Sequence, residues 1–313
     1  MTGPIQRIDA QAIREALPPI DAVEAIRDAL VAGFDPASAS ARTVVPTTAG
    51  QFLLMPSEVG AFAGVKVATV APGNPARGLP RIQAGYLLFD AETLTLRAEL
   101  DGTALTALRT PAVSIAALLP AVQRLVGGSP RIVVFGAGPQ AVGHVEMITA
   151  VLNGEVGDVS FVVRSPFQAA ASGTLSGSVL RAGSGEASAA LGAADIVVCA
   201  TTAREPLFDS REVHPDALVV AVGSHEPDAR ELDSALLARA QVIVEDRATA
   251  LREAGDIIMA IAEDALERDS LLDMRSVVIG SQALPDNGPV VFKSTGMAWQ
   301  DLVIATAVFE RIG

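Results

Sequence analysis

Five short apolar runs, separated by segments that can form helices, constrain the fold of this chain more than any other feature. The runs are Ile132–Phe135, Val159–Val163, Ile196–Ala200, Leu218–Val222 and Val242–Glu245. Apolar runs of this length are typical of strands that are buried on both faces. Sequential strands joined by helical crossovers imply a parallel, doubly wound sheet. The second half of the chain is therefore predicted to be an α/β domain.

The first of these strands leads into a glycine-rich loop, Gly136-Ala137-Gly138-Pro139-Gln140-Ala141, and a helical segment follows to Leu152. A Gly-x-Gly-x-x-Ala match alone is common, but the strand, turn and helix around it are the context that a dinucleotide-binding loop requires. The backbone then approaches a pyrophosphate at the helix N-terminus, where free N–H groups favour negative charge. We predict that these six residues bind a nicotinamide dinucleotide in a Rossmann domain.

Residues that follow three other strands are further candidates for cofactor contacts. Arg164 and Ser165 follow the second strand, where an acidic residue would favour NAD. A guanidinium and a hydroxyl can instead hold a 2′-phosphate, so NADP(H) is favoured and NAD(H) is possible. Thr201, Thr202 and Gly223 follow the next two strands and are predicted to line the nicotinamide half of the site.

The first third of the chain has a different pattern. Residues 8–34 have helical spacing and predict two helices, the second capped by Asp21, whereas residues 43–100 hold short alternating runs that predict a small sheet. One helix is expected to end near Arg109 and another to begin with Thr110 as its cap, before Pro111. Residues 297–311 return to helical spacing. We predict a smaller α+β domain of residues 1–120 and 295–313, and a Rossmann domain of residues 121–294.

Composition excludes several classes of function. The net charge of −13 disfavours nucleic acid as a partner. No apolar run approaches the roughly 18 residues of a membrane span, and the N-terminus lacks the pattern of a secretory signal, so no membrane partner and a cytoplasmic location are expected. Cys199 is the only cysteine and the three histidines lie far apart, so no metal site is predicted.

Several basic or polar residues precede the cofactor domain in settings that suggest a site. Lys66 lies within an apolar strand, where a lysine is rarely buried without a partner or a task. Burial and nearby guanidinium groups would lower its pKa and fit it for proton exchange, although an edge lysine facing solvent has the same pattern. Arg42 and Arg109 can together clamp a carboxylate, and Gln83 is a candidate substrate contact.

Together these motifs resemble the ornithine cyclodeaminase/mu-crystallin family over nearly the whole chain. The matching segments include Ala41-Arg-Thr-Val-Val-Pro, Leu54-Met-Pro, Gly64-Val-Lys-Val, Gly78-Leu-Pro, Leu88-Phe-Asp, Thr103-Ala-Leu-Thr-Ala-Leu-Arg-Thr, Arg230-Glu-Leu-Asp and Phe292-Lys-Ser-Thr-Gly. The resemblance implies a homodimer whose substrate and dimerisation domain is formed by both chain ends.

The resemblance also implies roles for individual residues. Lys66 becomes the acid/base candidate, with Arg109 and Arg42 on the substrate carboxylate. Lys293, Ser294 and Gly296 border the cofactor, as Thr110 is also expected to do. Ser224 and His225 join Gln83 as expected substrate contacts.

Two departures separate this chain from the true cyclodeaminases. Leu53 and Ser224 stand where those enzymes resemble one another in having acidic residues. Cyclisation needs a base, so the loss of both carboxylates disfavours ornithine as substrate. We predict an NAD(P)H-dependent oxidoreductase that reduces an α-imino acid (a ketimine) to the amino acid, close to the ketimine-reductase branch. The alternatives are ornithine cyclodeamination to proline and ammonia, or a non-catalytic protein that binds NADPH and a small ligand.

Overall fold

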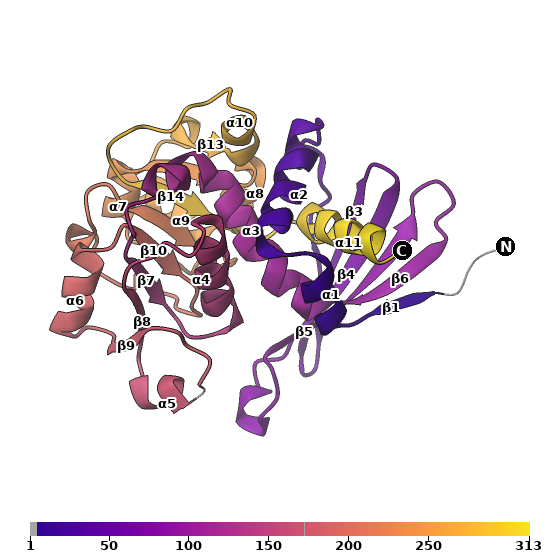
Figure 1. Cartoon of the computed structure of the whole chain (residues 1–313), viewed down its shortest axis with the longest axis horizontal. Coiled ribbons are helices and arrows are strands. Elements are labelled where there is room, and N and C mark those ends of the chain that lie inside the picture. Colours follow the sequence, from indigo (N-terminus) through magenta and orange to yellow (C-terminus); the bar gives the residue numbers. More distant parts are fainter. Residues whose placement is uncertain (1–4, 172) are drawn as a thin grey trace. The chain divides into compact units, whose positions relative to one another are not determined.

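The computed structural model describes residues 5–171 and 173–313 and divides the chain into two units (Figure 1). Unit 1 comprises Met1–Val113 and Met297–Gly313, and unit 2 comprises Ser114–Gly296. The boundaries lie seven residues before and two residues after those predicted at 120 and 294. Both ends of the chain therefore belong to the smaller unit.

Unit 1 contains a six-stranded sheet with the order β1-β6-β5-β4-β3-β2. Its strands are β1 (Gln6–Ile8), β2 (Thr43–Thr47), β3 (Gly50–Val59), β4 (Phe62–Val70), β5 (Ile82–Asp90) and β6 (Leu96–Asp101). The strands from β2 to β6 pair antiparallel with their neighbours, and β1 joins β6 in parallel. The predicted strands are present, whereas the short strand β1 was not anticipated, because three residues carry too little pattern.

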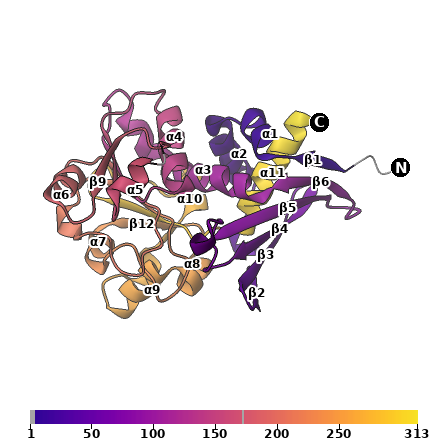
Figure 2. The same ribbon diagram turned by 90° about the horizontal axis from the view of Figure 1, so that it is seen from below.

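Helices α1 (Ala10–Ala16), α2 (Pro19–Val31) and α11 (Ala298–Ile312) lie over one face of this sheet (Figure 2). Their apolar stripes are buried, and the rings of Phe34 and Trp299 pack with centroids 5.2 Å apart. Figure 2 shows no helix of unit 1 over the opposite face among the described residues. The prediction that Asp21 caps α2 was wrong: Pro18 is the N-cap and Pro19 begins the helix, so Asp21 lies in its first turn.

Unit 2 contains an eight-stranded, wholly parallel sheet with the order β13-β12-β14-β11-β10-β7-β8-β9. The strands are β7 (Ile132–Phe135), β8 (Val159–Val163), β9 (Ser178–Arg181), β10 (Ile196–Cys199), β11 (Leu218–Ala221), β12 (Gln241–Val244), β13 (Leu272–Asp273) and β14 (Val290–Lys293). The predicted doubly wound Rossmann fold is confirmed. All five predicted strands are present, and their central residues, such as Val133 and Val219, are fully buried.

Among the described residues, seven helices lie wholly within unit 2. They are α4 (Pro139–Val151), α5 (Pro166–Ala171), α6 (Gly185–Gly192), α7 (Ser234–Arg239), α8 (Arg247–Glu253), α9 (Gly255–Ala262) and α10 (Met274–Val278). Parallel strands require such crossovers. Because β7, β10 and β11 are adjacent and point the same way, the residues that follow them meet at one edge of the sheet.

Helix α3 (Gly102–Val122) is continuous, and the predicted break at Thr110 was wrong. Proline in a helix interior removes a hydrogen bond, but the helix continues because Ala112–Leu118 are buried in the core. Thr110 does not cap a new helix, since its hydroxyl donates to the carbonyl of Thr106, 2.9 Å away. In the described chain, only Gly102–Leu125 is long and apolar enough to span a membrane, and 72% of its most apolar window is buried inside the structure, as in a core helix.

Candidate active site

Lys66 lies in the middle of β4, on the sheet face that packs against α11. Strand side chains alternate between faces, and the even-numbered positions Gly64, Lys66, Ala68 and Val70 of β4 are its buried set. Lys66 is 3% exposed. The alternative reading of Lys66 as an edge lysine facing solvent is therefore wrong.

Asp301 forms an ion pair with this buried ammonium. The Lys66 Nζ lies 2.6 Å from Asp301 Oδ2, and it also lies 3.3 Å from the hydroxyl of Thr106. Asp301 is fully buried in the first turn of α11. Sequence reasoning missed it because 235 residues separate the partners. The available signal was the polar pair Gln300-Asp301 on a helix whose other first-turn residues are apolar.

Arg109 approaches the same carboxylate from α3. Its Nε lies 3.5 Å from Asp301 Oδ1, and its Nη1 donates to the side-chain oxygen of Gln300 at 2.9 Å. Arg109 is 6% exposed and Gln300 is fully buried. The structure therefore brings Lys66 and Arg109 together around one acidic side chain, as a site with two cations and one anion.

The electrostatic surroundings of Lys66 lower its pKa from 10.5 to about 8. Burial is the largest cause, because it penalises the charged ammonium. Asp301 opposes this change and raises the pKa, whereas the charges of Arg109 and Arg42 lower it further. Arg42, which precedes the edge strand β2, is thus close enough to Lys66 to act on its charge. A lysine with a pKa about 8 can exchange protons near neutral pH.

Two other predicted features of unit 1 lie elsewhere on the sheet. Gln83 is exposed and pairs with Thr69 on β4. It is three positions from Tyr86, the register partner of Lys66, so alternation places its side chain on the other face of β5 from Lys66. The structure therefore does not bring Gln83 to Lys66. Leu53 is buried in a small apolar cluster with Ala68 and Val70.

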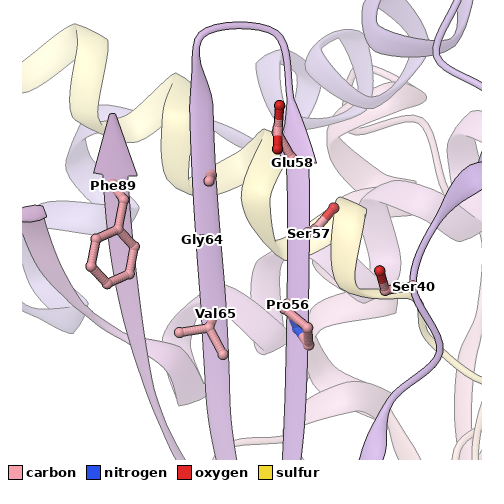
Figure 3. A pocket seen from close by; sticks show the side chains of 8 residues that line it. Ser40, Pro56, Ser57, Glu58, Gly64, Val65 and Phe89 are labelled. Atoms are coloured by element: carbon pink, nitrogen blue, oxygen red, sulfur yellow. The ribbon is translucent and has the colours of Figure 1, made fainter. Parts of the chain in front are cut away.

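A shallow pocket of about 290 Å³ lies over the strands β3, β4 and β5 (Figure 3). It is lined by Ser40, Pro56, Ser57, Glu58, Ala63, Gly64, Val65 and Phe89. None of the candidate substrate residues is among them. The odd-numbered Val65 and Phe89 belong to the face opposite Lys66 by strand alternation. The pocket is thus a feature of the uncovered face and lies apart from the Lys66 cluster.

The glycine loop of unit 2 has the shape that a dinucleotide phosphate needs. Gly136 has a φ of +116°, and a Cβ there would lie 2.5 Å from the carbonyl oxygen of Ala200, so only glycine fits. Gly138 is the N-cap of α4 and makes no side-chain cap hydrogen bond, and it is exposed together with Pro139. Ala141 is fully buried where the helix packs on the sheet. The loop therefore has the close backbone packing and the helix N-terminus that a pyrophosphate site needs.

Arg164 and Ser165 follow β8 and are both exposed. The structure adds a third residue to this place. Arg181 ends β9 and pairs in register with Val163, the residue before Arg164. Arg181 is exposed as well, so two arginines lie at the carboxyl ends of adjacent strands. No sequence motif indicated Arg181, because the segment around β9 is rich in small residues.

Glu231 joins the segments that follow β10 and β11. Its Oε1 accepts hydrogen bonds from the backbone N–H and the hydroxyl of Thr201, both at 2.8 Å, and its Oε2 accepts from the N–H of Gly223 at 2.7 Å. Glu231 is fully buried, and burial raises its pKa. The Thr201 hydroxyl, predicted to contact cofactor, therefore donates its proton within the unit. Thr202 is exposed beside it.

Lys293 is a second buried lysine with a carboxylate partner. It ends β14, is 1% exposed and lies 3.0 Å from Asp256 Oδ2. Its ammonium donates to the carbonyl oxygen of Ser224 at 2.7 Å. The Ser224 hydroxyl donates in turn to the carbonyl of Ala229 at 2.7 Å. The polar atoms of Lys293 and Ser224, both predicted to border ligands, are thus engaged inside unit 2, whereas His225 is half-buried.

The segment after Lys293 is held by Glu245. The Ser294 hydroxyl and the backbone N–H groups of Thr295 and Gly296 all donate to this carboxylate, at 2.9, 2.8 and 3.0 Å. Successive N–H groups of this kind form an anion-binding concavity. The structure fills it with a side chain of the protein. The donors of Ser294 and Gly296 that were expected to border the cofactor are therefore directed at Glu245.

Residues 10–313 match the ornithine cyclodeaminase/mu-crystallin family. The ketimine reductase mu-crystallin of Mus musculus is 35% identical over 276 residues, covering 86% of this chain and 83% of that protein. The Δ1-pyrroline-2-carboxylate/Δ1-piperideine-2-carboxylate reductase of Azospirillum brasilense is 34% identical over 273 residues, covering 83% and 81%. The structure of Thermococcus litoralis Δ1-pyrroline-2-carboxylate reductase with NADH and L-proline superposes with a TM-score of 0.85 at 25% identity, covering 98% of this chain and 97% of that one.

Proposed function

The chain belongs to the ornithine cyclodeaminase/mu-crystallin family, and we propose that it is an NAD(P)H-dependent reductase of α-imino acids. The observation that carries the proposal is the buried cluster of Lys66, Asp301 and Arg109. Cyclic ketimines of the Δ1-pyrroline-2-carboxylate and Δ1-piperideine-2-carboxylate type are the proposed substrates, because relatives with about a third of their residues identical are named for their reduction.

Reduction of an imine adds a hydride to carbon and a proton to nitrogen. When bound, the nicotinamide cofactor supplies the hydride. Lys66 supplies the proton to the nitrogen, since its pKa about 8 leaves most of it protonated at pH 7. Asp301 keeps the ammonium in place, 2.6 Å away, before the transfer. In the reverse direction the neutral amine of Lys66 takes the proton back.

Arg109 and Arg42 are proposed to hold the substrate carboxylate. A guanidinium has five N–H donors. Arg109 directs Nη1 at Gln300 and Nε toward Asp301, and its remaining donors are proposed to bind the carboxylate. The positive charges of Arg109 and Arg42 have a second effect, because they also lower the pKa of Lys66. The chain thereby contributes orientation and fixed charge to the reaction.

The test is turnover by the purified protein with a panel of imines. NADPH and NADH oxidation would be followed with Δ1-pyrroline-2-carboxylate, Δ1-piperideine-2-carboxylate, and pyruvate with methylamine. The opposing reaction is L-ornithine with NAD. Imine-dependent oxidation of the nucleotide is the expected result. Formation of proline and ammonia from ornithine without imine reduction would overturn the proposal.

Neither alternative function is favoured by the structure. Leu53 packs in an apolar cluster, and the Ser224 hydroxyl is bonded to the carbonyl of Ala229. Neither residue offers the base that ornithine cyclisation needs. A non-catalytic binding protein has no need for a buried ammonium at an energetic cost, yet Lys66 is almost fully buried and shares Asp301 with Arg109.

We propose NADP(H) as the preferred form of the cofactor. Arg164, Ser165 and Arg181 gather at the carboxyl ends of β8 and β9, where a dinucleotide ribose lies in Rossmann domains. Arginine binds phosphate in a bidentate manner. Replacing Arg164 with alanine is expected to raise the KM for NADPH about tenfold, which is ~1.4 kcal/mol, and to leave the KM for NADH within about twofold. An equal rise of the KM for NADPH and for NADH would contradict this preference.

We propose further that the chain forms a homodimer through the uncovered face of the unit 1 sheet. Alternation places Leu54, Val65, Val67 and Leu87 on this face, beside the exposed ring of Phe52. Contiguous apolar patches of this kind mark interaction sites. Light scattering should give the mass of a dimer for the wild type and of a monomer for Val65→Asp. A monomeric wild type would overturn the proposal.

A further inference from the structure

We infer that Glu231 is a positioning residue for the nicotinamide half of the cofactor site in unit 2. The inference rests on the proposed function, because it presumes a nicotinamide dinucleotide on the glycine loop. Glu231 does not reach that loop itself. It acts through Thr201 and Gly223, which follow two adjacent strands.

Glu231 uses both of its carboxylate oxygens to bind two segments of the chain. Thr201 donates two hydrogen bonds to Oε1, and the N–H of Gly223 donates one to Oε2. The segments are so close that a Cβ at Gly223 would lie 2.1 Å from the Thr201 carbonyl oxygen and 2.4 Å from Glu231 Oε1. One carboxylate thus fixes the spacing between the ends of β10 and β11.

The glycine loop touches the same place. A Cβ at Gly136 would lie 2.5 Å from the carbonyl oxygen of Ala200 and 3.6 Å from a methyl carbon of Thr201. Since β7, β10 and β11 are neighbours in one parallel sheet, the glycine loop after β7 lies beside the segments that Glu231 binds. In doubly wound folds the ligand lies along this carboxyl edge. The nicotinamide half must therefore lie against Thr201 and Gly223.

Glu231 is itself fixed by a chain of buried charges. The backbone N–H groups of Glu231 and Leu232 donate to Asp256 Oδ1 at 2.7 and 2.9 Å. Asp256 pairs with Lys293, whose ammonium donates to the carbonyl of Ser224. Every side chain in this chain of contacts is almost fully buried. Such a network is costly unless each member is satisfied, and when satisfied it rigidifies its surroundings.

A carboxylate is required at this position because it accepts from both segments. Glutamine has only one side-chain oxygen that can accept. Its NH₂ group would therefore face another donor, the backbone N–H of either Thr201 or Gly223. Such a mismatch leaves a buried donor unsatisfied. Glu231→Gln should therefore release one of the two segments without changing the size of the side chain.

The experiment compares two ligands by calorimetry. NADPH carries the nicotinamide ring, and 2′-phospho-ADP-ribose lacks this ring while keeping the 2′-phosphate, the pyrophosphate and both riboses. Glu231→Gln is expected to weaken NADPH at least about tenfold and 2′-phospho-ADP-ribose less than about twofold. Thr201→Val, which removes the hydroxyl donor and keeps the shape, should change the affinities in the same sense by a smaller factor.

Asp233→Asn is the matched control. The Asp233 carboxylate also accepts two backbone N–H bonds, from Ser210 and Leu236, but neither donor follows a strand at the carboxyl edge. Asp233→Asn should lower the Tm and leave the ratio of the two affinities unchanged. Equal weakening of both ligands by Glu231→Gln, or no weakening, would overturn the inference. A wild type that binds neither ligand would instead refute the proposed function.

Discussion

Each unit of this molecule contains a buried lysine paired with an aspartate, and the two pairs differ in what surrounds them. Lys66 lies 2.6 Å from Asp301, and Lys293 lies 3.0 Å from Asp256. All four side chains are almost fully buried. In unit 1 the neighbours of the pair are other side chains, including the cation Arg109. In unit 2 they are main-chain groups: Lys293 donates to a carbonyl, and Asp256 accepts two N–H bonds.

This difference separates the proposed site of proton transfer in unit 1 from a structural ion pair in unit 2. Main-chain partners cannot change their charge, so the pair in unit 2 is bound to fixed dipoles and holds its segments together. Burial destabilises the charged form of Lys66 most, and together with the nearby cations Arg109 and Arg42 it lowers the pKa to about 8. We therefore propose that the same two residue types serve proton exchange in one unit and rigidity in the other.

Lys66→Met is the largest expected effect. A positioned general acid contributes roughly 10²- to 10⁴-fold to the rate, so imine reduction should fall by about that factor. Because Lys66 belongs to unit 1 and the glycine loop to unit 2, the affinity for NADPH should stay within about twofold. Turnover and calorimetric titration with NADPH measure the two quantities. Retention of wild-type turnover would remove Lys66 from the mechanism.

Lys293→Met tests the other side of the comparison. Removing one partner of a buried ion pair costs about 3–5 kcal/mol, because Asp256 is left as an uncompensated charge. The free energy of unfolding, measured in urea, should fall by about that amount. At saturating substrate and cofactor, the rate of imine reduction should fall far less in Lys293→Met than in Lys66→Met. A loss of rate equal to that in Lys66→Met, with wild-type stability, would invert the assignment.

The fold could be predicted from sequence where the pattern was local. Each buried parallel strand of unit 2 that was predicted shows its own apolar run, and the glycine loop shows its own motif. The break at Pro111 was predicted wrongly because a local rule for proline was overridden by burial of the following turns of α3. β9 was missed because its four residues lie among serine, glycine and alanine.

The basic residues of the candidate site could be predicted from the sequence, whereas their acidic partners could not. Lys66 stands out in an apolar strand, and the family resemblance indicated Arg109. Asp301, Glu231 and Glu245 contact residues far away along the chain, and an isolated acidic residue has no pattern that distinguishes a buried partner from a surface charge. Lys293 and Ser294, which the resemblance implied border the cofactor, also have long-range acidic partners, since their polar atoms are directed at Asp256 and Glu245.

The pH dependence of the two directions of reaction sharpens the role of Lys66. The protonated form is the acid for imine reduction, and it is lost as the pH rises through about 8. We expect kcat/KM for reduction to fall about tenfold per pH unit above that value, and kcat/KM for amino-acid oxidation to rise with pH up to it. Asp301 raises the pKa of Lys66, so Asp301→Asn should move both limbs to lower pH. If a limb of the pH profile arises from titration of the substrate, Asp301→Asn would leave that limb unchanged.

Thr106→Val is the smallest of these changes and tests the second hydrogen-bond partner of Lys66. The hydroxyl oxygen of Thr106 lies 3.3 Å from the ammonium and helps to hold it, while the hydroxyl donates to the carbonyl of Gly102. A hydrogen bond of this length is worth about 1 kcal/mol, so kcat/KM should fall roughly fivefold. Because the contact favours the charged amine, the limb near pH 8 should also move slightly downward. Ser224, by contrast, holds Lys293 with its carbonyl, which no side-chain substitution removes. An unchanged rate and pH profile would show that Asp301 alone holds Lys66.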